Sequence, residues 1–588
     1  MRFFGGSEKH DMPFYSLPLL KEKASEKIVM VGKSEYLGIG EPLSFAGPSP
    51  RDENLQKDLE VALQKNNMYE SEAISSLRQS VMNKLEEIAK RFIYEASIRK
   101  GLTPDDAKKA GGKVLTFGSC RLGVQAANAD IDAVCVCPQH ITRSDFFEGV
   151  YKMLARRPEV TQLTAIRDAF VPIIKLKFSG IPVDLLCARL SLSTIPDNLD
   201  IDDTSLLVTL DERCIRSVNG TRVADEILKS VPDIPTFRTA VRCIKLWATR
   251  RGIYSNVLGF LGGVAWALMV ARVCQLYPNA CASTVASKVF GIMVNWNWPQ
   301  PVVLRHSPEG PPLPNIQSWN PRRNLIDRTH KMPIITPAYP TMCATHNMTN
   351  STFRIVIGEC KRAAQIMDKI MVGSLRWDAL FEGHAFFKNY RHYLQIVVSS
   401  DDSLRQLQWS GLVEARLRRL TTKLEAIHGL ALVHPFVEGF DNVYSCTSQE
   451  QIAAAVNGVG NISNQDDVDG VKIYTRTFYI GLYFRLGPVR EQGQIDISRP
   501  INEFKRYVRN WEQYDEQHMG IVVRYLRRSM LPDEVTRTAV TKRTNQTAEL
   551  SPSIKRARTK GIPETDNIPS PAINAPHMTL VEECSTTL

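Results

Sequence analysis

The sequence predicts a multidomain α+β protein, in which blocks of strands and blocks of helices follow one another. Its 588 residues exceed one domain, since about 150 residues per domain gives three or four. Strand-like segments lie in 113–186 and again in 471–486, and a long helical block separates them. With 43% hydrophobic and 23% charged residues, the composition excludes a collagen-like, mucin-like or wholly disordered chain.

Up to residue 190 the expected elements follow one another closely. In order they are an arm at 1–40, a Pro/Gly/Ser-rich loop at 41–50, helical periodicity over 51–100, strands at 113–117 and 131–136, and a hairpin at 170–186. The arms of the hairpin, VPIIKLKF and IPVDLL, meet at Ser179-Gly180, which is a turn dipeptide.

After residue 190 the prediction is mainly helical until strands return. The expected segments are helices at 238–251, 258–272 and 352–390, a proline-rich stretch at 299–340, a strand at 471–486 and a disordered tail at 531–588. The longest apolar run, 257–271, is shorter than the roughly 18 residues that span a bilayer, so it predicts a buried core helix. The N-terminus lacks the continuous apolar stretch of a secretory signal, and no membrane partner is expected.

The net charge of +11 favours a polyanionic partner, with nucleic acid ahead of a membrane surface. Residues 485–560 hold 16 Lys/Arg against 9 Asp/Glu, whereas residues 561–588 hold four carboxylates and no Lys or Arg. Cys135 and Cys137 alternate with valines, as reduced thiols in a buried strand do, which favours the cytosol or the nucleus.

The stretch FGSCRLGVQAANADIDAVCV (117–136) carries the chemistry. Gly118-Ser119 follows a strand in a turn that can present backbone N–H groups to phosphate. Asp130 and Asp132, at i and i+2 on an apolar strand, project from the same face. Their mutual repulsion is relieved by a divalent cation, and hard oxygen ligands suit Mg²⁺.

A third carboxylate on an adjacent strand would complete a two-metal site. Asp184 fits, because it interrupts the apolar strand IPVDLL, where a lone charge is costly to bury. Two metals about 4 Å apart can activate an attacking hydroxyl and stabilise a leaving pyrophosphate. Each feature alone has a commoner explanation as a surface loop, cap or strand end. Their ordered combination is the pattern of polymerase-β-like nucleotidyltransferases.

From about residue 40 to about residue 530 the sequence resembles the nuclear-type poly(A) polymerases of eukaryotes. The segments that carry the resemblance include FGSCRLGV, ADIDAVCV, FVPIIKLKFSGIPVDLLCARL, RCIRSVNGTRV, IKLWATRRGIYSNVLGFLGGVAWALMVARVCQLYPNA and MPIITPAYP. The resemblance implies a polymerase-β-like palm at 41–190, a mostly helical middle domain at 191–372 and an RNA-recognition-motif-like RNA-binding domain at 373–530.

The same resemblance implies a template-independent adenylyltransferase that adds AMP from ATP to the 3′-hydroxyl of pre-mRNA. Its expected cofactor is Mg²⁺, for which Mn²⁺ can substitute. Its expected partners are the RNA 3′ end, ATP, the cleavage and polyadenylation machinery and a nuclear poly(A)-binding protein. It implies a monomer located in the nucleus.

Residue by residue, the resemblance makes Asp130, Asp132 and Asp184 the catalytic metal ligands. The residues that match ATP contacts are Phe117, Gly118, Ser119, Asn219, Lys245, Tyr254, Gly263 and Val264. From the residues alone, Lys245 could equally lie on a solvated helix face and Tyr254 could pack between domains. Gly262-Gly263 within a predicted helix costs about 1 kcal/mol per glycine, so a base or a packed helix should approach that backbone closely.

Two positions depart from the family. Cys120 replaces the usual tyrosine and is expected to point away from the metals. Thr249 stands in the basic run after KLWA, so that a contact near the triphosphate is weakened or shifted.

The C-terminal third has two features that suit RNA. The strand VKIYTRTFYIGLYFRL could use its aromatic rings to stack bases or could bury them in a core. A basic helical region is predicted from Lys505, Arg506, Arg509, Arg524, Arg527 and Arg528. No ribonucleoprotein aromatic motif is present, which favours binding to the backbone over base readout.

In the tail, Lys542-Arg543 and the basic run Lys555 to Arg558 have the layout of a bipartite nuclear localisation signal. Two alternatives to adenylyl transfer remain. One is a related enzyme, a terminal uridylyltransferase or a CCA-adding enzyme. The other is an inactive RNA-binding scaffold, although all three carboxylates are present.

Overall fold

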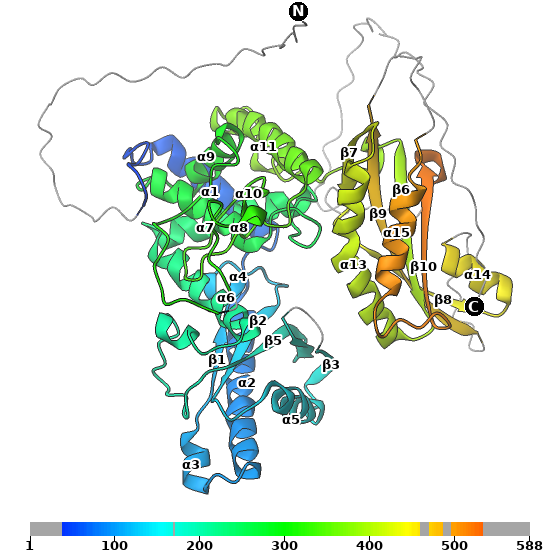
Figure 1. Ribbon diagram of the computed structural model, residues 1–588. Helices are drawn as coiled ribbons and strands as arrows, with labels where there is room; N and C mark the ends of the chain where they lie inside the picture. The colour runs from blue at the N-terminus through cyan, green and yellow to red at the C-terminus, as the bar shows by residue number, and fades with distance from the viewer. Residues whose placement is uncertain are drawn as a thin grey trace, which may run out of the picture. The chain divides into compact units, whose positions relative to one another are not determined.

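The computed structural model describes residues 38–167, 171–314, 316–458, 470–485, 495–532 and 535. Its helices and strands form a multidomain α+β arrangement, as predicted (Figure 1). Nearly all of the arm at 1–40 and of the tail at 531–588, and the whole predicted localisation signal, lie outside the described residues. Within the described part of the chain, no helix combines the length and the apolar character needed to cross a membrane.

Two capped helices open the described chain. α1 (Pro50–Lys65) begins after Ser49, whose hydroxyl accepts from the backbone N–H of Asp52 while the Asp52 carboxylate accepts from the backbone N–H of Ser49. α2 (Glu72–Arg99) begins after Ser71 and is followed by α3 (Pro104–Lys109). The helical periodicity predicted for 51–100 is therefore confirmed.

A mixed five-stranded sheet comes next, with the strand order β1-β2-β5-β4-β3. Its strands are β1 (Lys113–Thr116), β2 (Ile131–Cys137), β3 (Val160–Ile166), β4 (Ile173–Phe178) and β5 (Ile181–Arg189). β2 and β5 are parallel, whereas the other neighbouring pairs are antiparallel. The predicted hairpin is present, and Ser179 and Gly180 both have the positive φ that a tight hairpin turn needs.

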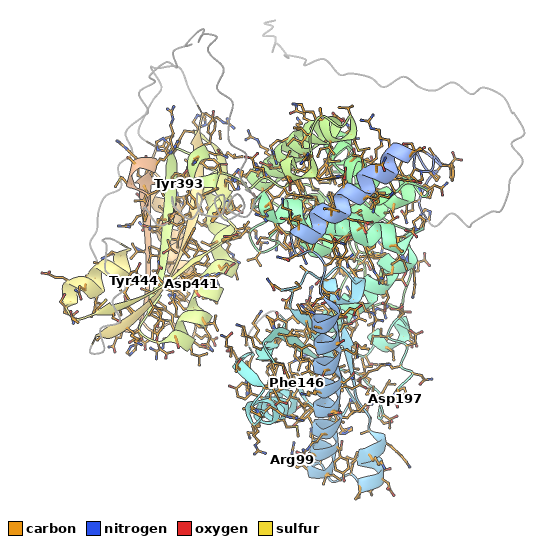
Figure 2. The ribbon with its side chains drawn as sticks, turned by 180° about the vertical axis from the view of Figure 1, so that it is seen from behind. Arg99, Phe146, Asp197, Tyr393, Asp441 and Tyr444 are labelled. Atoms are coloured by element: carbon orange, nitrogen blue, oxygen red, sulfur yellow. The ribbon has the colours of Figure 1, made fainter. Side chains whose placement is uncertain are left out.

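Helices cover both faces of this sheet. Ala133 and Cys135 of β2 face a core shared with α2 and α5 (Arg143–Ala155). There Phe146 of α5, labelled in Figure 2, packs edge to face on Phe92 of α2, and the ring centroids are 6.3 Å apart. Val134 faces the other way, towards α6 (Glu212–Lys229). Burial on both faces explains why β2 is apolar at nearly every position.

The middle of the chain is helical. After α6 its elements are α7 (Ile234–Arg250), α8 (Gly263–Leu276), α9 (Ala282–Asn295), α10 (Leu325–Arg328) and α11 (Asn350–Met371), with a 3₁₀ turn, η1 (Thr204–Leu207), before them. At its centre Trp247 packs edge to face on Trp266 and Phe290, with centroids 5.5 and 4.7 Å apart. The apolar run predicted to be a core helix supplies much of α8, which is almost entirely buried beyond its first turn.

Two predicted helices are shorter than expected. Residues 258–262 are not helical, because Gly259 has a φ of +90° and Tyr254 forms a β-bridge with Leu261. The helix predicted over 352–390 ends at Met371, shortly before Gly373 with its φ of +77°. Beyond it lie only η2 (Trp377–Ala379) and α12 (Phe386–Asn389).

The C-terminal domain has the RNA-recognition-motif-like order that the resemblance implied. Its elements are β6 (His392–Ser400), α13 (Ser403–Glu425), β7 (Leu430–Pro435), β8 (Phe440–Cys446), α14 (Gln449–Asn457), β9 (Val471–Phe484), α15 (Ser498–Arg509), β10 (Met519–Arg527) and η4 (Arg528–Met530). The sheet order β10-β6-β9-β7 is that of a βαββαβ fold, into which β8 and α14 are inserted. α13 and α15 lie on one face of this sheet, whereas α14 lies across β8 and β9 (Figure 1).

Candidate active site

The three predicted carboxylates come together at one end of the parallel strand pair. Asp132 on β2 lies directly opposite Asp184 on β5 in the strand register, and Asp130 immediately precedes β2. Each of the three offers a carboxylate oxygen, and these oxygens all lie within 4.8 Å of one another. β2 and β5 are far apart in sequence, so only their parallel pairing completes the cluster.

Crowding changes the protonation of this cluster. Burial raises the pKa of Asp132 to about 7, and the negative charges of Asp130 and Asp184 add to the shift. A cation bound among the three oxygens would offset this repulsion and favour the charged form of Asp132. Hard oxygen donors at this spacing suit Mg²⁺ or Mn²⁺, so the residues present fit a divalent metal.

A lysine already faces one of these carboxylates. Lys175 on β4 is opposite Asp184 in the hairpin register, and its Nζ lies 2.7 Å from Asp184 Oδ2. Its side chain is half exposed, so it can move away at little cost. Lys175 was not predicted, although counting back from the Ser179-Gly180 turn would have placed it opposite Asp184.

Gly118 brings the turn after β1 against the carboxylates. The backbone N–H of Phe117 donates to the carbonyl of Asp132 across 3.0 Å, and a short helix, α4 (Gly118–Leu122), begins at the next residue. Gly118 has a φ of +59°, and a Cβ added to it would lie 2.5 Å from Asp132 Oδ2. Only glycine therefore fits here, and Ser119 follows within the same turn of helix.

Lys245 and Tyr254 reach the same region from the middle domain. Burial lowers the pKa of Lys245, while the charges of Asp130 and Asp132 act in the opposite direction. Lys245 is thus a partly buried cation near both carboxylates, and the solvated helix face considered above does not apply. Burial raises the pKa of Tyr254 to about 12, and the same two carboxylates add to the shift.

Gly262 and Gly263 are at the start of α8, not inside a helix as predicted. Gly262 is the N-cap and Gly263 the first helical residue. A Cβ on Gly263 would lie 2.5 Å from the hydroxyl oxygen of Tyr254, so the group close to this backbone is a tyrosine side chain, which was not among the groups expected there. Val264 follows in the first turn and is 37% exposed.

Asn219 on α6 is buried with part of its amide unused. It is 7% exposed, its Nδ2 lies 3.9 Å from the Met342 sulfur, and its Oδ1 accepts no hydrogen bond. The next residue, Gly220, leaves room for the Phe117 ring, which would be 3.0 Å from an added Cβ. Asn219 therefore keeps a buried acceptor without a partner, and the residue that follows it packs on a predicted ATP contact.

Asn256 is a further polar residue that the sequence did not point out. Its Oδ1 is buried without a partner, and its Cβ is 3.1 Å from the position of a Cβ on Gly262. Its backbone carbonyl accepts from the Asn347 side chain. No motif or period marks this residue, so only the folded chain reveals it.

Basic residues after α7 are bound to protein groups. Arg250 donates to the Asn66 side chain across 3.0 Å, and Arg251 forms a two-fold ion pair with Glu359. Thr249 is exposed. Cys120 is the other departure from the family, and burial raises the pKa of its thiol. The charges that act on it include those of Arg78, Glu70 and Asp132.

In the C-terminal domain, two of the five aromatic residues of β9 are buried in the core, two are half-buried and one is exposed. Phe478 and Tyr479 are each 2% exposed, whereas Tyr483 is 55% exposed. The predicted basic helical region is wrong as one element. Its members divide between α15 (Lys505, Arg506, Arg509), β10 (Arg524, Arg527) and η4 (Arg528).

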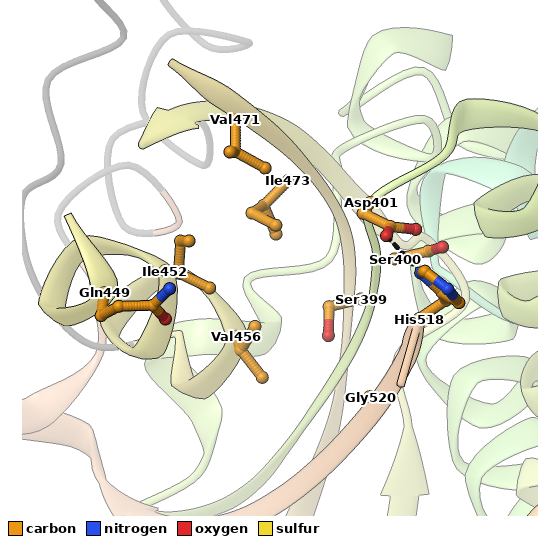
Figure 3. A pocket seen from close by; sticks show the side chains of 10 residues that line it. All are labelled: Ser399, Ser400, Asp401, Gln449, Ile452, Val456, Val471, Ile473, His518 and Gly520. Carbon is orange, nitrogen blue, oxygen red and sulfur yellow. Dashed lines mark hydrogen bonds and ion pairs between the residues drawn. The ribbon is translucent and has the colours of Figure 1, made fainter. Parts of the chain in front are cut away.

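A cavity of about 150 Å³ opens within the C-terminal domain (Figure 3). Apolar side chains of α14 and β9 line it, and His518 pairs with Asp401 at 2.5 Å on its wall. The Ser399 hydroxyl is buried on the same wall without a hydrogen-bond partner. None of the predicted metal or ATP residues contributes to this cavity.

Comparison with family models gives the class of protein. Residues 38–231 match the poly(A) polymerase nucleotidyltransferase domain, residues 236–383 the poly(A) polymerase central domain, and residues 385–545 the poly(A) polymerase predicted RNA binding domain. Together with the carboxylate cluster on its mixed sheet, these matches make the chain a nucleotidyltransferase with an RNA-binding domain.

Curated relatives narrow the class to one family. The chain is 42% identical to poly(A) polymerase pla1 of Schizosaccharomyces pombe over 89% of its length and 98% of that protein. It is 40% identical to poly(A) polymerase PAPa of Candida albicans over 85% of this chain and 93% of that one. The chain belongs to the poly(A) polymerase family, and it is an adenylyltransferase.

Among solved structures, Cid1, an RNA terminal uridylyl transferase, matches with a TM-score of 0.41 and 15% identity. The match covers 57% of this chain and 99% of that one.

Proposed function

We propose that the protein makes poly(A) tails on pre-mRNA, adding AMP from ATP to the RNA 3′-hydroxyl at Asp130, Asp132 and Asp184. The observation that carries this proposal is the register that sets Asp132 opposite Asp184, with Asp130 within reach of both. We propose Mg²⁺ as the cofactor, with Mn²⁺ as a substitute.

The three carboxylates would hold the metal. When bound, two divalent cations would lower the pKa of the attacking 3′-hydroxyl and neutralise charge on the leaving pyrophosphate. Asp184 is the carboxylate that we assign to the side of the attacking hydroxyl. The Lys175 ammonium group, which lies 2.7 Å from Asp184, would move away when the bound cations neutralise this carboxylate.

The remaining predicted residues would bind ATP. Lys245 is a partly buried cation near the carboxylates, and we assign it to the triphosphate together with Ser119 and the backbone of Gly118. The Asn219 Oδ1, which has no hydrogen-bond partner, could accept a hydrogen bond from a ribose hydroxyl.

The other ATP contacts would surround the adenine base and complete the pocket. We assign Phe117, Gly263 and Val264 to the base and the Tyr254 hydroxyl to the nucleotide. Closure of the first domain on the middle domain would bring the ATP contacts of the two domains together around the nucleotide.

We place the protein in the nucleus and propose that it acts there as a monomer. The basic segments at 542–543 and 555–558 support this location. The proposed protein partners are the cleavage and polyadenylation machinery and a nuclear poly(A)-binding protein, which the family resemblance supports.

The metal assignment is tested by Asp132→Ala. We expect this variant to lose AMP incorporation on an RNA primer and to keep the wild-type thermal midpoint. Asp197→Ala is the matched control, because Asp197 is an exposed aspartate within the nucleotidyltransferase match at 38–231 and its partner is Lys90. Normal incorporation by Asp132→Ala would refute the assignment.

Nucleotide choice is tested by primer extension with each of the four NTPs. We expect ATP to be used in preference to the others. Preferential use of UTP would instead favour a uridylyltransferase, and a lack of calorimetric Mg·ATP binding would favour a scaffold.

A further inference from the structure

Asp130 differs from the other two carboxylates in how its backbone is held. Asp132 and Asp184 lie within β2 and β5, where ladder hydrogen bonds fix the main chain. Asp130 precedes β2, which begins at Ile131, and is itself exposed. Its position therefore depends on the irregular segment 124–130, which we name the strap.

One buried arginine holds the strap. Arg78 of α2 is 5% exposed, and its Nη2 donates to the carbonyls of Ala129 and Ala127 across 2.5 and 3.4 Å. Its Nε forms an ion pair of 2.8 Å with Glu70. The other oxygen of Glu70 accepts from the Gln125 side chain across 2.9 Å. The Arg78–Glu70 ion pair is therefore hydrogen-bonded to the strap near both of its ends.

The contact with Ala129 acts directly on Asp130. The carbonyl oxygen of Ala129 and the nitrogen and Cα of Asp130 belong to one planar peptide unit. Fixing this oxygen fixes the plane from which the Asp130 side chain starts. A displacement of about 1 Å of a group in a catalytic site can cost about 100-fold in rate.

We propose that Arg78 is a positioning residue that aims the Asp130 carboxylate into the metal site. The proposal rests on the metal assignment made above. It gives α2, a helix that contributes no metal ligand in our assignment, a defined part in the reaction.

Geometry requires arginine at this position. A guanidinium is a planar fork that can reach Glu70 and the strap carbonyls from one rigid unit, whereas a lysine presents a single ammonium group. Arg78 Nη1 is buried and makes no hydrogen bond. A buried donor without a partner lowers stability, so this arginine is poorly explained as a stabilising residue alone.

The test compares Arg78→Lys with a matched buried arginine. Arg272 of α8 is 9% exposed and also donates to a loop carbonyl, that of Ile39, but it does not contact the strap. Binding of Mn²⁺ in the presence of a non-hydrolysable ATP analogue is measured by electron paramagnetic resonance, together with thermal midpoints. Asp130→Asn is included as the reference for loss of a ligand.

We expect Arg78→Lys to weaken Mn²⁺ binding by about 10- to 100-fold, as outer partners of metal ligands do, and Arg272→Lys to leave it unchanged. At saturating Mn²⁺ the KM for ATP should stay at the wild-type value while kcat is reduced. If Arg78→Lys does not fold, Glu70→Gln, which keeps the arginine, should show a smaller shift of the same sign.

Two results would overturn the proposal in different ways. Wild-type Mn²⁺ affinity in Arg78→Lys together with lost affinity in Asp130→Asn removes the role of Arg78 and leaves the metal site standing. Wild-type affinity in Asp130→Asn removes the metal assignment, and the role of Arg78 with it.

Discussion

At the scale of single residues, Gly118 lies close against Asp132 in the candidate site. Gly118 combines a positive φ with a position at which an added Cβ would lie 2.5 Å from a carboxylate oxygen of Asp132. Gly180, in the β4–β5 turn, has a φ of +81° but nothing within 4 Å of an added Cβ. A substitution at Gly180 therefore adds backbone strain alone, whereas a substitution at Gly118 adds the same strain and a clash with Asp132.

We predict that Gly118→Ala reduces AMP incorporation by about 100-fold, because the new methyl group must displace Asp132 or the turn. Gly180→Ala should cost about 1–2 kcal/mol of stability from its φ and leave activity intact. Steady-state kinetics and urea unfolding of both variants provide the check. If Gly118→Ala and Gly180→Ala were equally active, the clash with Asp132 would have no effect on the reaction and the prediction would be contradicted.

At the scale of elements, one carboxylate of the C-terminal domain caps a helix of the middle domain. Glu425, the last residue of α13, accepts from the backbone N–H of Ser351 across 2.7 Å and from the Thr349 hydroxyl across 2.6 Å. Its second oxygen accepts from the backbone N–H of Asn350. An anion at the N-terminus of α11 is stabilised by the helix dipole, so this contact connects two domains.

Removing this cap should lower stability. We predict that Glu425→Ala lowers the free energy of unfolding by about 1–2 kcal/mol, which is the usual range for a lost helix cap. Glu87→Ala, at an exposed position in α2, is the control and should change stability by less than about 0.5 kcal/mol. A Glu425→Ala variant as stable as this control would contradict the prediction.

At the scale of the whole molecule, two histidines connect stability to pH, of which His384 is half-buried and His434 is fully buried. Burial lowers the pKa of His384 to about 4, and the cation of Arg251 adds to the shift, while Glu359 opposes it and Arg362 supports it. Burial also holds the pKa of His434, on β7, well below its usual value. His434 Nδ1 lies 2.6 Å from the Tyr390 hydroxyl oxygen. Both rings are therefore neutral in the folded protein at neutral pH.

The direction in which stability changes with pH follows from the protons that the folded and unfolded states bind. Below about pH 6.5 an unfolded histidine takes up a proton that folded His384 does not bind until about pH 4. The stability from the neutral ring is therefore complete above about pH 6.5 and is lost as pH falls towards 4. For His384 the loss amounts to about 3 kcal/mol at most.

We predict that the free energy of unfolding falls between pH 7 and pH 4.5 and that His384→Gln falls less steeply. His428→Gln, at an exposed position, should keep the wild-type slope. Urea unfolding at a series of pH values measures these slopes. Identical slopes in all three proteins would exclude His384 as a source of the acid sensitivity.

The sequence alone determined much of the fold and the identity of the carboxylates. A continuous apolar run was enough for β2, and two β-rich segments joined at Ser179-Gly180 were enough for the β4–β5 hairpin, because apolar runs and turn dipeptides are local properties. The ordered motif pointed to Asp130, Asp132 and Asp184. Helix ends were less predictable, because the positive φ of Gly259 before α8 and of Gly373 after α11 is not encoded in the apolar pattern.

Other predictions lie beyond what the structure tests. The domain limits at 190, 372 and 530 stay predictions, and so do the roles of the ATP-site residues and the localisation signal. The alternation of aromatic residues in β9 was compatible with base stacking or with a core. Phe478 and Tyr479 belong to the core, whereas Tyr483 is exposed.

Tertiary structure decided what surrounds the carboxylates. The parallel pairing of β2 with β5 sets Asp132 opposite Asp184, and Arg78 reaches the Ala129 carbonyl from a helix some fifty residues earlier in the chain. Such contacts depend on the packing of distant segments, and no local period or motif records them. The sequence named the chemical groups, whereas the packing of α2, β2 and β5 determined where their charges meet.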